Sequence, residues 1–280
     1  LLTQKAFWPK VILYTMRKQL FFNEIIYHKA LEPLKVKWRE TLTATQDGMW
    51  ETITDSSKHL EIRLDNQLIG YACIDDDNRL LQFFVQPEQL QEGPHILEQL
   101  IDQKQIKSAL VGTNNPVFQS LAISFQQSMV IDTYLFSDLI KSEVIHPFGQ
   151  LKLAWEADLN GLVDFYHDTI GAPVAWLNNY LLNLISRGEL FYLTDGTEVL
   201  GTCEVRLSDS DHRFADIGMV VGLNHRKKGL GTYLLGKAKE LSYDSGRTPI
   251  CSCEAGNIGS LKAIHKNGFR SIHQMLKLSF

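Results

Sequence analysis

A basic loop between an apolar segment and a helix-like pattern is the part of this sequence best suited to chemistry. Four basic side chains, His225–Lys228, are followed at once by Gly229 and Gly231. Backbone N–H groups at a helix start lack partners inside the helix, and the helix dipole adds positive charge there. Glycine removes the side chains that would keep a phosphate away from these groups. The loop therefore predicts an anion site, although such a segment is also compatible with a solvated turn. Its spacing matches neither GxxxxGK[ST] nor GxGxxG.

The elements on either side must position this loop. Residues 214–221 predict a strand that ends at Val221, and apolar residues at helical spacing from Leu230 predict a helix that ends near Gly246. Around them we expect helices over 156–170, 173–188 and 258–269, and strands over 189–195, 198–207, 249–255 and 271–280. Three consecutive strands indicate antiparallel pairing, and the later strand–helix–strand unit indicates a parallel crossover.

Composition limits the classes of function. The net charge of −4 gives no domain-wide basic excess, so a nucleic-acid partner is not expected. No apolar run reaches the length of a membrane span, and the N-terminal segment is interrupted by lysine and arginine, unlike a signal peptide. The four cysteines form neither a disulfide framework nor a zinc pattern. We expect a cytoplasmic protein without a metal site. The oligomeric state is not indicated.

An internal repeat divides the sequence. Residues 66–74 resemble 197–205, residues 80–95 align with 216–231, and residues 120–129 align with 260–269. The offsets between the aligned segments increase from 131 to 136 and 140 residues, as two short insertions in the second half would produce. A duplicated domain follows. We place the boundary within 141–150 and expect domains over 1–145 and 146–280.

The second half resembles the GNAT superfamily of acyl-CoA N-acyltransferases. Arg226-x-x-Gly229-x-Gly231, five residues after Val221, is similar to the acetyl-CoA loop of that family. The segment 215–221 is similar to its fourth strand. The segment 257–269, with an asparagine before a short helix that ends in Gly-Phe, is similar to its second signature. The resemblance implies an α+β, mixed α/β fold. Two tandem domains would each have a central mixed, mostly antiparallel sheet flanked by helices.

The resemblance also implies a binding mode for acetyl-CoA. The diphosphate would lie on the backbone N–H groups of residues 227–232, and the pantetheine arm would run between two splayed strands near Met219 and Val221. Asn257 would help to hold that arm. The residues implied in binding are Met219, Val220, Val221, Arg226, Lys227, Lys228, Gly229, Leu230, Gly231, Thr232 and Asn257.

In this family an acyl group passes directly to an amine, which must be neutral to attack. Asp216 occupies a strand position where many relatives carry an acidic residue, and Glu204 lies on the neighbouring strand. Either carboxylate could take the proton, or each could be an ion-paired strand residue. The N–H of Met219 or Val220 is implied to stabilise the oxyanion.

The sequence departs from the family at Ile264, where many relatives carry a tyrosine close to the leaving thiolate. A general acid is therefore in doubt. Cys251 and Cys253 are expected to be packing residues.

The first half resembles a degenerate copy of the same domain. Leu90 aligns with Arg226, Glu92 with Lys228 and His95 with Gly231, and Pro94 removes an N–H group. Its first 60 residues do not match the core pattern and are expected to form helices that cover the acceptor site.

The resemblance thus implies an N-acetyltransferase that uses acetyl-CoA and a small-molecule or peptide amine of unknown identity. Two alternatives remain open. One is a CoA-sensing or partner-binding module without activity, and the other is a transferase for aminoacyl or larger acyl groups.

Overall fold

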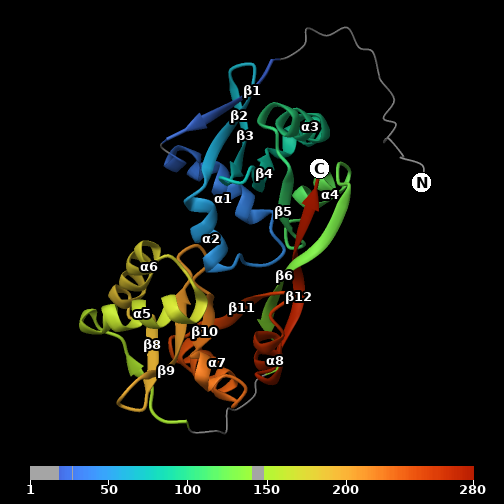
Figure 1. The fold of residues 1–280 in the computed structure, drawn as a ribbon. Helices are drawn as coiled ribbons and strands as arrows, with labels where there is room; N and C mark the ends of the chain where they lie inside the picture. The colour runs from blue at the N-terminus through green and yellow to red at the C-terminus, as the bar shows by residue number, and fades with distance from the viewer. Residues whose placement is uncertain (1–18, 27, 141–147) are drawn as a thin grey trace. The chain divides into compact units, whose positions relative to one another are not determined.

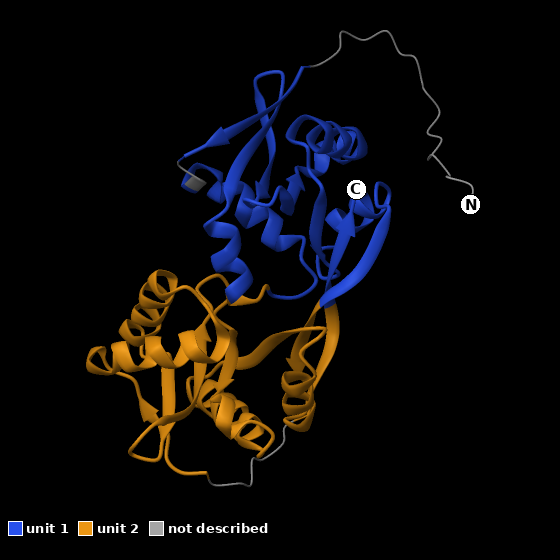
Figure 2. Cartoon of the chain, viewed as in Figure 1, with its two compact units in different colours: residues 1–45, 49–132, 274–280 blue, residues 46–48, 133–273 orange. Residues whose placement is uncertain are grey.

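The computed structural model describes residues 19–26, 28–140 and 148–280. The expected boundary at residues 145 and 146 lies outside the described residues, as does the segment before Gln19. The chain forms two compact units (Figure 2). Unit 1 comprises described residues up to Thr45 together with 49–132 and 274–280, and unit 2 comprises 46–48 and 133–273.

Unit 1 contains a sheet with the strand order β1-β2-β3-β4-β5-β12 and four helices (Figure 1). Only β4 and β5 pair in parallel; the other neighbours in this order are antiparallel. The elements that begin in this unit are β1 (Leu20–Ile25), α1 (Glu32–Glu40), α2 (Gly48–Asp55), β2 (Lys58–Leu64), β3 (Gln67–Ile74), β4 (Arg79–Val85), α3 (Gly93–Lys104), β5 (Ser108–Gly112), α4 (Pro116–Ile123) and β6 (Ser128–Asp138).

Unit 2 repeats this plan with the strand order β6-β11-β10-β9-β8-β7, in which only β10 and β11 are parallel. Its further elements are β7 (Lys152–Leu153), α5 (Leu159–Ile170), α6 (Val174–Ser186), β8 (Leu190–Thr194), β9 (Val199–Leu207), β10 (Phe214–Val221), α7 (Leu230–Asp244), β11 (Thr248–Glu254), α8 (Ile258–Lys266) and β12 (Phe269–Ser279). The expected mixed, mostly antiparallel fold with flanking helices is confirmed, and each helix and strand expected in the second half is present.

The strand registers of the two units show the same internal repeat as the sequence. Gly70 lies opposite Val85 in unit 1, and Gly201 lies opposite Val221 in unit 2. These pairs are related by the offsets of 131 and 136 residues found in the sequence. In both units the residue after the valine donates its N–H back across the ladder: Gln86 to Ile69 at 2.8 Å, and Gly222 to Leu200 at 3.0 Å. The aligned segments are thus equivalent in structure.

The two units differ in two ways from a division at residue 145. β6 follows unit 1 in the chain, yet its residues from Thr133 pair with β11 in unit 2. The end of β12, from Met275 to Ser279, pairs with β5 in unit 1. Each half of the chain therefore supplies the last strand of the sheet in the other unit. An unpaired sheet edge can accept such a strand from a distant part of the chain.

The N-terminal part of the described chain also differs from expectation. Helices α1 and α2 are present, but Leu20–Ile25 form strand β1, antiparallel to β2. The acidic segment 75–78 forms the turn between β3 and β4, with Asn78 at a φ of 58°.

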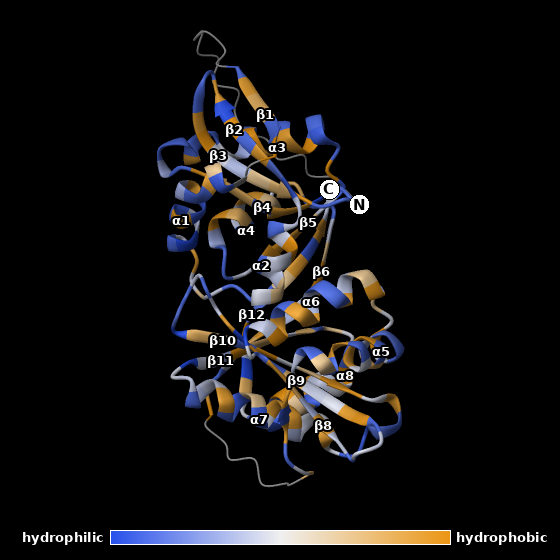
Figure 3. Ribbon diagram, turned by 90° about the vertical axis from the view of Figure 1, so that its left-hand side faces the viewer, coloured by the Kyte–Doolittle hydropathy of each residue, from blue (hydrophilic) through white to orange (hydrophobic). Residues whose placement is uncertain are grey.

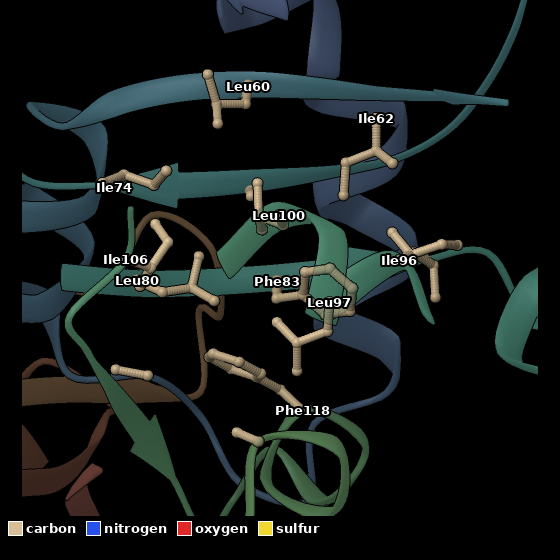
Figure 4. Close-up of a cluster of buried hydrophobic side chains, with 14 of the residues drawn as sticks. Leu60, Ile62, Ile74, Leu80, Phe83, Ile96, Leu97, Leu100, Ile106 and Phe118 are labelled. Atoms are coloured by element: carbon tan, nitrogen blue, oxygen red, sulfur yellow. The ribbon is translucent and has the colours of Figure 1, made fainter. Parts of the chain in front are cut away.

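Apolar side chains fill the space between each sheet and its helices. In unit 1 they come from β2, β3 and β4 and pack against α3 and α4 (Figure 4). Unit 2 has a cluster on each face of its sheet: Leu162, Leu177 and neighbouring residues of α5 and α6 cover one face, and Leu234 and Ile264 of α7 and α8 cover the other. The helices α6 and α7 each show hydrophobic and hydrophilic stretches (Figure 3), as expected of helices with one buried side.

Candidate functional site

Two strands of unit 2 separate next to the basic loop. The pairing of β10 with β11 runs from Phe214↔Thr248 to Asp216↔Ile250, and both strands continue beyond it. The outer edge of β10 pairs with β9 as far as Val221, and that of β11 pairs with β6 as far as Glu254. The inner edges of residues 217–221 and 251–254 are thus left unpaired with each other. An extended chain with amide groups could hydrogen-bond to such edges.

The direction of the N–H groups on β10 follows from its ladder with β9. Gly222 donates to Leu200 of β9, and the register is regular from Ala215 to Val221. Antiparallel strands alternate between residues that bond across the pair and residues that do not. Val220 therefore turns its N–H toward β9, whereas Met219 and Val221 turn theirs toward the gap. Of the two N–H groups expected to stabilise an oxyanion, that of Met219 has the required direction.

The basic loop bends through left-handed backbone at two places before α7 begins. Lys227 has a φ of 63° and Gly229 a φ of 90°. The strained lysine is a feature that folds retain chiefly at functional sites. No side chain caps the start of α7, and its first turn carries no acidic residue. The N–H groups of Leu230, Gly231 and Thr232 lie in the first turn of α7, where they have no acceptor within the helix. This arrangement fits a diphosphate.

The side chain of Arg226 bonds to two backbone carbonyls. Its Nε donates to the carbonyl of Val221 at 3.2 Å, and its Nη2 donates to the carbonyl of Thr169 at 3.2 Å. The side chain therefore ties the loop to the end of β10 and to the last turn of α5. Lys227 and Lys228 are exposed.

Gly231 and Asn257 flank the gap from its two sides. A Cβ on Gly231 would lie 3.4 Å from Met219 and Val221, so the start of α7 packs closely on β10. Asn257 precedes α8, and its Oδ1 accepts the N–H of Ser260 at 3.1 Å. The amide nitrogen of this exposed residue points away from that cap bond and can donate to a ligand.

The corresponding loop of unit 1 has a different conformation. Residues Pro87–Glu92 form a 3₁₀ helix, and Gly93 has a right-handed φ of −48° where Gly229 is left-handed. Pro94 lies in the first turn of α3, and Glu92 is its N-cap. A missing N–H and an acidic residue both oppose anion binding there. The loop of unit 1 thus differs in backbone conformation from that of unit 2.

Both candidate bases belong to one buried polar cluster on the face of β9 and β10 that α5 and α6 cover. Glu204 is 4 % exposed. Its Oε1 accepts from the Tyr166 hydroxyl at 2.7 Å, and its Oε2 accepts from the Tyr180 hydroxyl at 2.5 Å and from Arg206 Nη1. Each carboxylate oxygen therefore has a donor. Such a carboxylate is held in place by its neighbours.

Asp216 lies opposite Arg206 in the register and is 2 % exposed. Its Oδ2 accepts from Arg206 Nη2 at 2.6 Å, from Arg206 Nε at 3.1 Å and from the Gly48 N–H at 3.1 Å. Its Oδ1 is buried and has no hydrogen-bond partner among the described residues. Burial raises the pKa of Asp216 to about 7, against the lowering effect of Arg206, and the charge of Asp47 raises it further. A carboxylate of this pKa can exchange a proton near neutral pH.

Ile264 occupies the position at which many relatives carry a tyrosine, where the sequence put a general acid in doubt. Ile264 is 2 % exposed and packs in the core between the sheet, α7 and α8. Cys251 and Cys253 are buried, and burial raises the pKa of both thiols, which opposes a nucleophilic role. They are packing residues, as expected.

The sequence analysis missed four residues of the cluster. Arg206 contacts both candidate bases and the two tyrosines, Tyr166 and Tyr180, contact Glu204, while Asp47 acts through its charge. Arg206 has a signal in the sequence, because side chains at 204 and 206 of one strand point to the same face. No local pattern connects Asp47 or the two tyrosines with this site.

Within residues 19–26, 28–140 and 148–280, no three His, Cys, Asp or Glu side chains gather as metal ligands would. In the same residues, no helix combines the length and apolar character needed to cross a membrane.

Comparison with known proteins supports the reading of both halves. Residues 27–139 match a family model described as "Acetyltransferase (GNAT) domain", and residues 158–269 match one described as "Acetyltransferase (GNAT) family". No curated protein matches the chain.

Solved structures match nearly the whole chain. An acetyltransferase of the GNAT family from Colwellia psychrerythraea is 29% identical, with a TM-score of 0.86 over 93% of this chain and 99% of that one. A tandem GNAT protein from the clavulanic acid biosynthesis pathway is 14% identical, with a TM-score of 0.65 over 94% and 98%. A GCN5-related N-acetyltransferase from Sphaerobacter thermophilus is 13% identical, with a TM-score of 0.65 over 92% and 94%. The last two show the fold alone.

The repeated register, the separated strands with their glycine loop, and the two family matches lead to one assignment. The chain belongs to the GNAT superfamily of acetyltransferases and carries two GNAT domains in tandem.

Proposed function

We propose that this protein is an N-acetyltransferase that moves the acetyl group of acetyl-CoA directly to a primary amine. The observation that carries the proposal is the combination in unit 2 of the gap between β10 and β11 with the uncapped start of α7. The gap offers backbone edges for the pantetheine arm, and the loop of residues 227–232 offers N–H groups for the diphosphate. Unit 1 lacks this loop conformation, so we assign cofactor binding to unit 2 alone.

The residues proposed to bind acetyl-CoA keep the roles that the family resemblance implies, with two refinements. Lys227, Lys228, Gly229, Leu230, Gly231 and Thr232 surround the diphosphate, while Met219, Val221 and Asn257 bond the pantetheine arm. Arg226 holds the loop in position through two carbonyls. The side chain of Val220 packs against the buried apolar side chains of α5 and α6.

Bound acetyl-CoA would supply an acetyl group activated as a thioester. The amine nitrogen forms the new bond to the acetyl carbon while the carbon–sulfur bond breaks, and the sulfur leaves as a thiolate that takes a proton from water. The N–H of Met219 faces the gap and stabilises the carbonyl oxygen as negative charge develops on it. With Ile264 in the core, we assign no protein group to protonation of the sulfur.

Asp216 is the proposed general base. Its Oδ1 has no hydrogen-bond partner in the part of the chain that the structure describes, and its pKa of about 7 lets it accept the proton of the amine and pass it to solvent. Glu204 already accepts three hydrogen bonds, so we assign it the role of holding Arg206 and the tyrosines in place.

The test is turnover with a panel of primary amines. Release of the CoA thiol and an acetyl mass increase on the amine should both depend on the amine. Tight binding of acetyl-CoA without acetylation of any amine or of lysine peptides would instead support the cofactor-sensing alternative. Faster transfer from longer acyl-CoA donors would support the alternative of a transferase for larger acyl groups.

A further inference from the structure

The first turn of α7 contains little that fixes its own position. Gly229 precedes the helix with a φ of 90°, no side chain caps the start, and Gly231 is the second helical residue. Glycine leaves the backbone more conformational freedom than any other residue. When N–H groups must become ordered on binding, the free energy of ordering them is lost from the affinity. A diphosphate site at this turn therefore needs support from outside the loop.

The side chain of Asn267, at the end of α8, bonds to this turn. Its Nδ2 donates to the carbonyl of Thr232 at 3.0 Å and to the carbonyl of Ala263, in its own helix, at 2.9 Å. Thr232 is the third residue of α7, and its N–H is one of those assigned to the diphosphate. The first bond therefore joins the end of α8 to the turn of α7 that is proposed to hold the ligand.

Asn267 is itself held in a buried network. It is 1% exposed, and its backbone carbonyl accepts from Lys239 Nζ at 2.9 Å. Lys239 is 2% exposed and also donates to Asp138 of β6 at 2.8 Å. Buried polar groups that satisfy one another in this way make the surrounding structure rigid. Asn267 is thus a fixed point from which the start of α7 can be held.

The first half of the chain offers a comparison without the glycine loop conformation. The alignment of residues 120–129 with 260–269 places Gln127 at the position of Asn267. Gln127 is exposed, whereas Asn267 is buried. The buried amide therefore occurs in the unit in which the loop glycine, Gly229, is left-handed, and not in the unit in which its counterpart, Gly93, is right-handed.

We propose that Asn267 is a positioning residue for acetyl-CoA, which holds the first turn of α7 so that its N–H groups are in place before the diphosphate binds. Asn257, proposed to bond the pantetheine arm, caps the start of the same helix α8. The bond from Asn267 to Thr232 thus also fixes the two parts of the cofactor site relative to each other. The inference rests on the proposed function, since it concerns cofactor binding at the same loop.

The experiment is calorimetry on the full chain with CoA and with pantetheine, which lacks the diphosphate and the adenosine. The wild type should bind CoA more tightly than pantetheine. Asn267→Ala should weaken CoA binding by about 10-fold and leave pantetheine binding almost unchanged. Asn267→Ser separates the two bonds of the amide, because a serine hydroxyl can donate to the carbonyl four residues earlier, here that of Ala263, but is too short to replace the bond to Thr232. It should weaken CoA binding as much as alanine does.

Ser242→Ala is the matched control. Ser242 is a fully buried residue of α7 whose hydroxyl donates to the carbonyl of Ala238 at 2.9 Å, away from the loop. Its loss should lower Tm and leave the affinity for CoA unchanged. In the transfer reaction, both Asn267 variants should raise the KM for acetyl-CoA and change kcat little when assayed well below their Tm.

The outcomes separate this inference from the function on which it rests. Unchanged CoA affinity in both Asn267 variants, an equal loss for CoA and pantetheine, or the same loss of CoA affinity in Ser242→Ala would overturn the inference and leave the proposed function standing. A wild-type protein that binds CoA no more tightly than pantetheine would contradict the diphosphate site itself, and the inference with it. Because the binding measurement needs no turnover, it holds whether or not an acceptor has been found.

Discussion

Arg206 donates two hydrogen bonds to a single oxygen of Asp216, Oδ2, from the position directly opposite on the neighbouring strand. The other oxygen, Oδ1, is left buried without a hydrogen-bond partner among the described residues. One carboxylate thus has a fixed side and an available side. In the proposed function, Oδ1 takes the proton while Arg206 holds Oδ2 in place.

The pH dependence of turnover should report Asp216. Because the base must be ionised and burial raises its pKa to about 7, kcat/KM should rise with pH and level off above that value. Asp216→Asn keeps an acceptor for Arg206 but removes the base, and should lower kcat/KM by about 10²-fold or more. Steady-state rates across this pH range provide the measurement.

Glu204→Gln is the matched comparison for that experiment. It should reduce the rate less than Asp216→Asn, because Glu204 holds its neighbours and takes no proton in this account. If Glu204→Gln were the more damaging change, the two roles would be reversed.

Stability should also depend on Asp216. Its folded-state pKa lies above the unfolded value of about 3.9, so the folded state binds the extra proton between these two values. The wild-type protein should therefore lose this contribution as the pH rises from about 4 to about 7. Relative to the wild type, Asp216→Asn should gain in Tm over the same interval. Thermal unfolding at several pH values checks this, with Asp209→Asn as a control that should follow the wild type.

Arg226 should act by position and not by charge. Loss of its bonds to the carbonyls of Val221 and Thr169 in Arg226→Ala should raise the KM for acetyl-CoA by about 10-fold and change kcat little. Arg226→Lys keeps the charge but not the two-carbonyl geometry, so it should do no better than alanine. Full recovery with lysine would show that the charge contacts the ligand. Arg213→Ala, at an exposed pair with Asp211, is the control.

Ile264 should matter for folding and not for proton transfer. Ile264→Ala removes a side chain that is 2 % exposed and should lower the free energy of unfolding by about 2–5 kcal/mol. Its kcat, measured well below its own Tm, should stay close to that of the wild type. Ile264→Tyr should also destabilise the core by overpacking. A large gain in rate with tyrosine would mean that an acid is missing and limits the reaction.

The sequence was most informative where chemistry and local pattern coincide. The glycine loop, the strand that ends at Val221 and the asparagine before α8 were all predicted, because turns, strand ends and helix caps have local signatures. The repeat also aligned the segments around Gly70 and Gly201, which have matching registers in the two sheets.

Contacts between residues far apart in the chain could not be predicted from the sequence. β6 and β12 have patterns that fit either sheet, so the exchange of final strands could not be predicted. Arg206 could have been placed beside Glu204 by strand alternation, but its pairing with Asp216 depends on the register of β9 and β10. Asp47 joins the cluster from a distant loop, which only the folded chain shows.

The central claim, a single acetyl-CoA site at the loop of unit 2, is tested most directly by calorimetric titration of the full chain with acetyl-CoA. The wild-type protein should bind one equivalent. Gly229→Glu should abolish binding, because it adds a side chain and a negative charge beside the diphosphate. Gly246→Glu is the matched control, since Gly246 also has a positive φ, 73°, with open space around its Cβ position and no place in the loop. It should still bind one equivalent. Two equal sites in the wild type, or unchanged affinity in Gly229→Glu, would contradict the account.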